Sequence, residues 1–93
     1  MIIGAALIEV HIPGSTSLKA KRSVLNRIKE RIKSRFNVSV AEVDYQDLWQ
    51  RAAIGVAVVG LEKRVVESTL SSIVRLVEME TRAEITQVRT EFY

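Results

Sequence analysis

The 93-residue sequence contains no cysteine, one proline and four glycines. The absence of cysteine excludes disulfide bonds, thiolate nucleophiles and zinc sites built on cysteine. With a hydrophobic content of 47%, the composition is that of a packed globule and not of a disordered tail. A chain of this length has room for one domain, so we expect residues 1–93 to form a single domain without a separate catalytic unit.

Long apolar segments are also missing. No run approaches the ~20 residues that a membrane-spanning helix needs. The apolar start at residues 2–8 has no basic segment before it and is interrupted by Glu9, which is not the pattern of a signal peptide. We therefore expect an unexported protein of the cytoplasm.

Hydrophobic periodicity predicts four strands and two helices. Alternating apolar residues indicate strands at 2–12, 38–44 and 48–59, and the pattern at 84–92 slips phase once, as at a bulge or a sheet edge. Helical spacing covers residues 18–36 and 62–80. The strands at 2–12 and 48–59 are apolar on both faces over part of their length, so they are expected at the centre of the sheet. This order predicts an α+β, ferredoxin-like β-α-β-β-α-β fold, with two helices on one face of a four-stranded antiparallel sheet.

Positive charge is concentrated in one segment. The net charge is +3, and eight of the 14 Lys and Arg residues lie between Lys19 and Arg35, with Glu30 as the one acid there. Eight cations and one acid give this segment +7, and the other six cations and ten acids give −4. Such asymmetry indicates a polyanionic partner, nucleic acid before membrane. A solvated helix face, whose long side chains shield the core, is an alternative of equal weight.

The predicted topology gathers several polar residues at one rim of the sheet. The first strand ends there, the first helix begins there, and the turn at 45–47 lies beside them. We expect His11 beside Trp49 and Glu9 beside Arg51 across the two central strands, all four on the face without helices. The lone histidine lacks a metal-ligand spacing such as HxxxH, and residues 14–17 lack a P-loop pattern and are expected to cap the helix. We therefore predict no catalytic residue, no cofactor and no metal site.

The basic segment and this rim together predict an RNA-binding surface. The phosphate-contacting residues would be Lys19, Lys21, Arg22, Arg27, Lys29, Arg31, Lys33 and Arg51. Trp49 would stack on a base, although packing in the core or an interface is its commoner use. A small enzyme that acts on a phosphorylated or acyl-phosphate substrate is a weaker alternative, supported only by the Ser-rich loop beside Lys19 and Lys21.

The sheet face without helices is predicted to be small and apolar. Exposed apolar patches usually mark a partner surface, and a second copy packed face to face is the leading candidate. The expected interface consists of Ile3, Ala5, Leu7, Ala53, Ala57 and Val59. A homodimeric interaction or regulatory module without nucleic-acid binding is therefore the alternative to an RNA-binding protein.

Four segments of the chain resemble the YlxP-like family of small bacterial proteins. They are Ile12-Pro13-Gly14 and residues 17–23, 37–44 and 47–52, of which the stretch from Asp47 to Arg51 is the most specific. The resemblance spans nearly the whole chain and implies a ferredoxin-like fold and a bacterial cytoplasm. It also implies that the gene lies near genes of translation-initiation and ribosome-maturation factors. This favours ribosomal RNA as the expected partner. It implies no established reaction and transfers no catalytic residue. Family members commonly have His where this chain has Tyr45, so this turn is not expected to supply an essential ligand.

Overall fold

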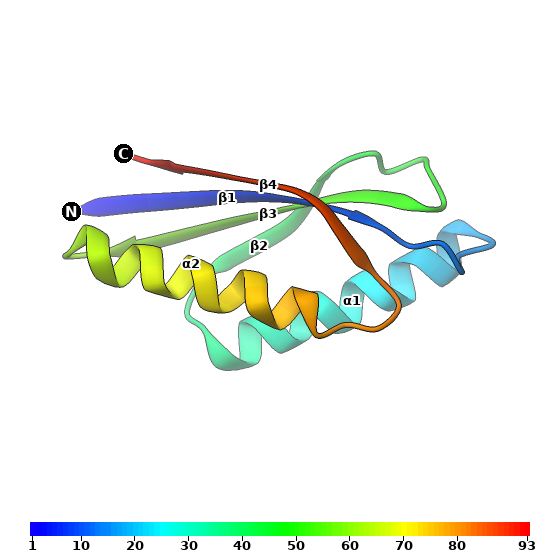
Figure 1. Ribbon diagram of the computed structural model, residues 1–93, viewed down its shortest axis with the longest axis horizontal. Helices are drawn as coiled ribbons and strands as arrows, with labels where there is room; N and C mark the ends of the chain where they lie inside the picture. The colour runs from blue at the N-terminus through cyan, green and yellow to red at the C-terminus, as the bar shows by residue number, and fades with distance from the viewer.

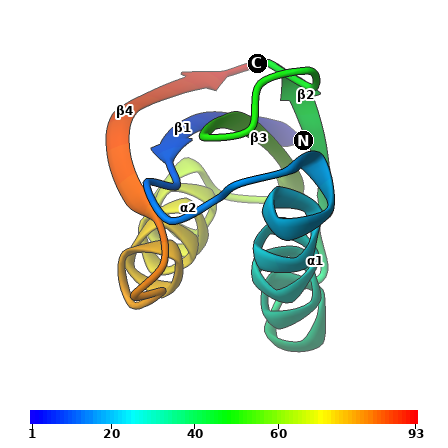
Figure 2. The same ribbon diagram turned by 90° about the vertical axis from the view of Figure 1, so that its right-hand side faces the viewer.

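The computed structural model describes all 93 residues. Its elements are β1 (Ile2–His11), α1 (Leu18–Arg35), β2 (Ser39–Asp44), β3 (Arg51–Gly60), α2 (Lys63–Glu78) and β4 (Glu84–Phe92) (Figure 1). The strands form one antiparallel sheet in the order β2-β3-β1-β4, and both helices cover the same face of it (Figure 2). The predicted ferredoxin-like fold, with β1 and β3 at the centre, is confirmed. Neither helix is long and apolar enough to cross a membrane.

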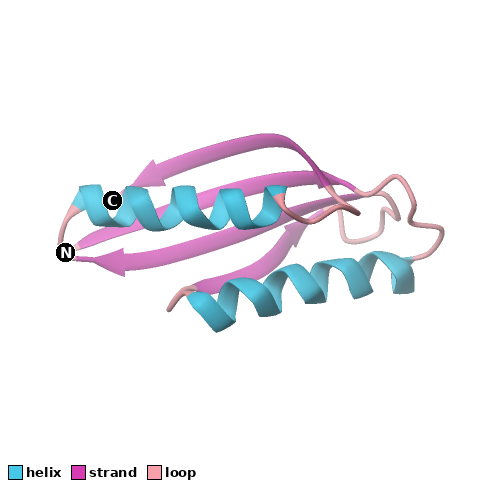
Figure 3. Ribbon diagram, turned by 60° about the horizontal axis from the view of Figure 1, so that its bottom comes forward, coloured by secondary structure: helices cyan, strands magenta, loops and turns pink.

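The two helices divide the covered face between them. α1 packs beneath β2 at one side of the sheet, and α2 packs beneath β1 and β3 (Figure 3). α1 begins at Ser17, whose hydroxyl accepts a hydrogen bond from the backbone N–H of Ala20 at 3.0 Å and so satisfies one of the free N–H groups of the first turn. The flank of α1 away from α2 is exposed at Lys19, Arg22 and Lys33 and half-buried at Lys29.

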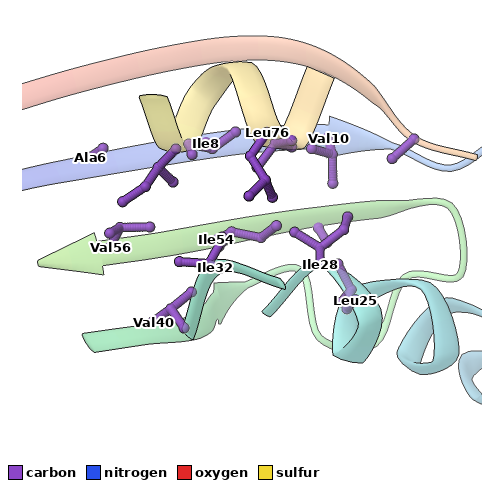
Figure 4. Close-up of a cluster of buried hydrophobic side chains, with 14 of the residues drawn as sticks. Ala6, Ile8, Val10, Leu25, Ile28, Ile32, Val40, Ile54, Val56 and Leu76 are labelled. Carbon is purple, nitrogen blue, oxygen red and sulfur yellow. The ribbon is translucent and has the colours of Figure 1, made fainter. Parts of the chain in front are cut away.

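The core lies between the sheet and the helices (Figure 4). Its central side chains are Ala6, Ile8, Val10, Ile54 and Val56 from the sheet, Leu25, Ile28 and Ile32 from α1, and Leu76 from α2. Burial of each large aliphatic side chain contributes about 1.5–3 kcal/mol, which is enough to hold a small domain together. Gly4 allows α2 to approach β1 closely, since a Cβ atom there would stand 2.4 Å from Cγ1 of Val66.

β3 begins three residues later than predicted. The backbone N–H of Leu48 donates to the carbonyl of Tyr45, which closes a turn, and the Gln50 side chain donates to the carbonyls of Pro13 and Ser15. The turn and the Gln50 side-chain bonds hold residues 48–50 as a loop, although the Gln50 carbonyl still accepts a hydrogen bond from the backbone N–H of Ile12. Trp49 therefore lies in the loop before β3 and not in the sheet.

The predicted pairing between β1 and β3 is wrong by two residues. His11 stands opposite Arg51, and Glu9 stands opposite Ala53. Because side chains alternate between the faces, a shift of two keeps Glu9, His11 and Arg51 on the face without helices, whereas Trp49 lies outside the sheet. The register of β1 against β4 shifts between Glu9 and Val10, which confirms the irregularity expected from the phase slip, and β4 is an edge strand.

Candidate nucleic-acid interface

The cations of α1 fall into two rows on its surface. At about 100° of rotation per residue, Arg22, Lys29 and Lys33 share one flank of the helix, with Lys19 at the edge of this flank. Arg27, Arg31 and Arg35 share the opposite flank. We call Lys19, Arg22, Lys29 and Lys33 the outer row. None of its four members lies within 4.0 Å of a carboxylate oxygen, and a band of Ser23, Asn26 and Glu30 separates it from the other flank.

Arg27 and Arg31 face α2 and a buried acid. The carboxylate of Glu80 is only 4% exposed and lies 3.9 Å from the Arg27 guanidinium and 3.8 Å from that of Arg31. These distances are too long for hydrogen bonds, so the pairs act through charge alone. Glu80 therefore offsets part of the positive charge on this flank, and it leaves the outer row and Arg35 without a carboxylate partner.

Lys21 is not available to a phosphate. Its side chain is 0% exposed, and its Nζ lies 2.9 Å from the Glu42 carboxylate. It also donates to the carbonyls of Tyr45 and Arg51 at 2.8 and 3.2 Å. An ammonium group has three protons, so these partners satisfy it fully. The interpretation of Lys21 as a phosphate contact is therefore wrong, and its role is to join α1 to β2 and to the loop at 45–50.

Arg51 is held at the rim by an acid and an aromatic ring. Its guanidinium donates to Glu9 Oε1 at 2.8 Å and to the Tyr45 hydroxyl at 2.9 Å, and it lies 3.8 Å from the centre of the Tyr45 ring. The hydrogen bond to Glu9 raises the pKa of Arg51 above its ordinary value. Desolvation raises the pKa of Tyr45, against the opposite effect of Arg51. Arg51 thus neutralises a nearly buried carboxylate, which makes it a poor candidate for a free phosphate contact.

Trp49 is exposed, but the basic helix α1 has no aromatic residue that could stack a second base beside it. Trp49 is 55% exposed, in the loop whose Gln50 bonds to the segment preceding α1. These bonds hold the loop beside the segment that precedes α1. One ring near Lys19 and Arg22 is compatible with a peripheral contact to a base, but it is no stacking platform.

The polar residues of the rim are engaged with the protein itself. The Ser15 hydroxyl donates to the carbonyl of Ser17, and the Ser17 hydroxyl caps α1, as predicted for this loop. His11 Nδ1 lies 3.8 Å from the Glu84 carboxylate. No group of three or more His, Asp or Glu side chains is placed to hold a metal ion. The rim therefore holds His11, Ser15 and Ser17 in contacts within the protein.

The sheet face without helices contains a shallow apolar hollow of about 460 Å³. Its floor and sides come from Ala5, Leu7, Ala41, Val43, Gly55 and Ala57, and its border includes Arg89, Glu91 and Tyr93. Of the residues predicted for a dimer interface, Ala57 and Val59 are exposed, and Ile3, Ala5 and Leu7 are half-buried. Ala53 is only 1% exposed, so it has no surface to offer a partner.

Two acids that organise α1 escaped the sequence analysis. Glu80 follows Ile73 and Val77 at helical spacing. Glu42 is two residues after Val40, so both side chains point to the covered side of β2. The sequence signal for such an acid is its position in line with a stripe of apolar residues, which predicts that it is buried. A buried carboxylate needs a cation nearby. The basic segment at residues 19–35 was the obvious source of such cations.

Comparison with known proteins places the chain in a family. Residues 3–90 match the family described as "Protein of unknown function (DUF503)", and the chain belongs to it. It is 39% identical over 92 residues to the uncharacterized protein YlxP of Bacillus subtilis (strain 168), which covers 99% of this chain and 100% of that protein. The resemblance predicted from the four segments is confirmed, and it brings no activity with it.

The similarity to solved structures concerns the fold of this chain and nothing else. The de novo designed protein Foldit4 has 17% sequence identity and a TM-score of 0.60, covering 98% of this chain and 97% of its own. A dimeric ferredoxin-like protein from an uncultured marine organism has 9% identity and a TM-score of 0.47, covering 100% of this chain and 94% of its own.

Proposed function

We propose that this member of a family without an assigned function is a small basic binding protein of the bacterial cytoplasm that associates with RNA, ribosomal RNA in particular. The observation that supports the proposal best is the outer row, four cations on one flank of α1 with no carboxylate partner. Uncompensated Lys and Arg side chains in a row are what a phosphate backbone requires. The genes that the family resemblance implies nearby, those of ribosome maturation and translation initiation, point to the same partner.

The structure narrows the residues proposed for this contact. Lys21 is buried, Arg51 is paired with Glu9, and Arg27 and Arg31 share the charge of Glu80. The outer row remains, with Trp49 as a peripheral neighbour at the start of α1. No catalytic group enters the proposal, because the rim residues are bonded to one another.

Cosedimentation with ribosomal particles tests the association. We expect the full chain to travel with the particles at about 50 mM salt and to be released near 200 mM, since each phosphate contact makes binding salt-dependent. The variant Lys29→Gln/Lys33→Gln should be released at lower salt than the wild type. Crosslinking in cells followed by sequencing would identify the RNA. Recovery of no enriched RNA, together with binding that is unaffected by salt or by the double variant, contradicts the proposal.

A second candidate function is a homodimeric interaction module, which the apolar hollow favours. A second copy packed face to face would cover Leu7, Val43 and Ala57, and the unpaired Arg89 of one copy would have Glu91 of the other as an acidic partner. Burial of such a patch is favourable at about 25 cal/mol per Å² of apolar surface.

Analytical ultracentrifugation tests this dimer. We expect Leu7→Glu and Ala57→Glu to shift the protein towards a monomer, because both place a charge in the hollow. Val65→Glu is the matched control, since Val65 is an exposed apolar residue on α2, away from the hollow. A wild type that remains a monomer at micromolar concentration rules the dimer out. The RNA proposal does not depend on this result.

A further inference from the structure

The outer row extends along one flank of α1 for most of its length, with Lys19 at the edge of that flank. From Lys19 to Lys33 there are 14 residue steps, which correspond to about 21 Å at 1.5 Å per residue. Ser17 caps the helix and all four side chains project from the same rigid element, so their spacing is preset. A row of this kind matches a ligand whose phosphates also hold preset positions.

The same surface lacks the means to hold unpaired bases. Between the two rows of α1 the exposed residues are Ser23, Asn26 and Glu30, and none has a ring. Proteins that bind single strands combine a basic groove with aromatic side chains on which successive bases stack. Near the start of α1 the exposed ring is Trp49, and the ring of Tyr45 in the same loop is already covered by the Arg51 guanidinium at 3.8 Å, so a second base would find no free ring there.

The open sheet face does not supply the missing platform. RNA-recognition domains with a four-stranded sheet stack bases on aromatic residues of the two central strands. In this chain the corresponding residues of β1 and β3 are aliphatic or glycine: Ile3, Ala5, Leu7, Ala53, Gly55 and Ala57. His11 and Arg51 lie on the same face at the rim, where each faces a carboxylate, and Tyr93 stands at the border of the hollow. The middle of the two central strands therefore has no ring on which bases can stack.

We propose that the RNA recognised by the outer row is double-helical and is held through its phosphates, without readout of bases. This inference rests on the proposed function and names its ligand class. A duplex presents its phosphates in fixed rows, so α1 can bind it without ordering a flexible strand. Contacts of this kind recognise shape and charge, as in other proteins that bind double-stranded RNA.

Fluorescence anisotropy with the full chain distinguishes the two forms of RNA. The probes are an RNA duplex of about 16 base pairs, the span of a known double-stranded-RNA domain, and each of its strands alone, chosen to lack internal pairing. We expect the duplex to bind at least about tenfold more tightly than either strand. Four phosphate contacts predict a slope of log K against log salt of roughly −3 to −4, taking about 0.9 per contact.

Two variants with equal loss of charge locate the site. Arg22→Gln/Lys29→Gln/Lys33→Gln removes three cations of the outer row and should flatten the slope by about 3. Lys63→Gln/Arg64→Gln/Arg75→Gln removes three exposed cations of α2 and should leave the slope nearly unchanged. Circular dichroism would establish that both variants fold.

The outcomes separate this inference from the proposed function. If a single strand binds as tightly as the duplex, RNA binding stands and the duplex inference is wrong. If neither form binds, the proposed function itself fails. If the slope of log K against log salt flattens equally in both triple variants, binding depends on net charge alone. The outer row is then not the site, which overturns the inference.

Discussion

Replacing Lys21 with methionine should destabilise the fold far more than its position on a basic helix suggests. The Lys21 ammonium is fully buried, and the Glu42 carboxylate opposite it is largely shielded, with a side-chain exposure of 16%. Apart from this ion pair, Glu42 Oε2 has no hydrogen-bond partner. Removal of one member of a buried pair leaves an uncompensated charge, at a typical cost of about 3–5 kcal/mol. The variant also removes the donor for the carbonyls of Tyr45 and Arg51, which releases the loop before β3.

This loss is a large share of the total stability of a small domain. Domains of this size unfold with about 5–15 kcal/mol, and one kcal/mol moves their Tm by about 4–8 °C. We therefore expect Lys21→Met to lower the Tm by at least about 12 °C. Guanidinium unfolding, followed by circular dichroism and by Trp49 fluorescence, measures the change in free energy.

Two companion variants make the test specific to the buried pair. Lys19→Met removes an exposed cation two residues away and should change the free energy of unfolding by no more than about 0.5 kcal/mol. The double variant Lys21→Met/Glu42→Leu removes both charges and should recover much of the loss, because an apolar pair of similar volume is often as stable as a buried ion pair. If Lys21→Met matches the wild type, or if Lys21→Met/Glu42→Leu is no more stable than Lys21→Met, the reasoning is refuted.

Three further changes test the packing, the helix start and the rim. Gly4→Ala should lower the free energy of unfolding by about 1–3 kcal/mol, because its methyl group collides with Val66, whereas Gly14→Ala meets open space and should be tolerated; denaturant unfolding compares them. Ser17→Ala removes the cap of α1 and should cost about 1 kcal/mol in the same assay. Since the pKa of Tyr45 is raised in the folded state, its contribution to stability is complete below its ordinary pKa near 10 and is lost as the pH rises through the folded value; Tyr45→Phe should abolish that part of the alkaline loss and of the phenolate absorbance change.

The fold was predictable from the sequence because its signals are local. Alternation at residues 2–12 and helical spacing at 18–36 identify the strand and the helix without knowledge of their neighbours. The start of β3 was not predictable in this way. Residues 48–50 look like strand, but the Gln50 side chain bonds to the loop after β1, a segment more than thirty residues earlier in the chain. Periodicity does not report such long-range bonds.

For the candidate site, the sequence predicted the excess of positive charge but not which cations are free. The excess of cations at residues 19–35 is visible in the sequence, but which of them remain free depends on acids elsewhere. Lys21 falls within the apolar arc of α1, and this was the sign that it turns inward, yet its burial requires Glu42 from β2. The positive charge of Arg27 and Arg31 is partly offset by Glu80, which lies just after the end of α2. Charge counting cannot separate these roles, since it treats every cation alike.

The stability of α1 gives little reason for the charges on its outer row. A cation in the first turn of a helix opposes the macrodipole at about 0.3–1 kcal/mol, and the first turn of α1 contains Lys19 but no acid to offset it. Lys29 and Lys33 stand four residues apart, a spacing at which like charges repel by a few tenths of a kcal/mol. Among the four cations of the outer row, only Lys33, in the last turn, is favoured by the dipole. A phosphate backbone beside the row would relieve each of these costs at once. The pattern is therefore better explained by an anionic partner than by the folding of the helix, and this argument is independent of the net charge of the chain.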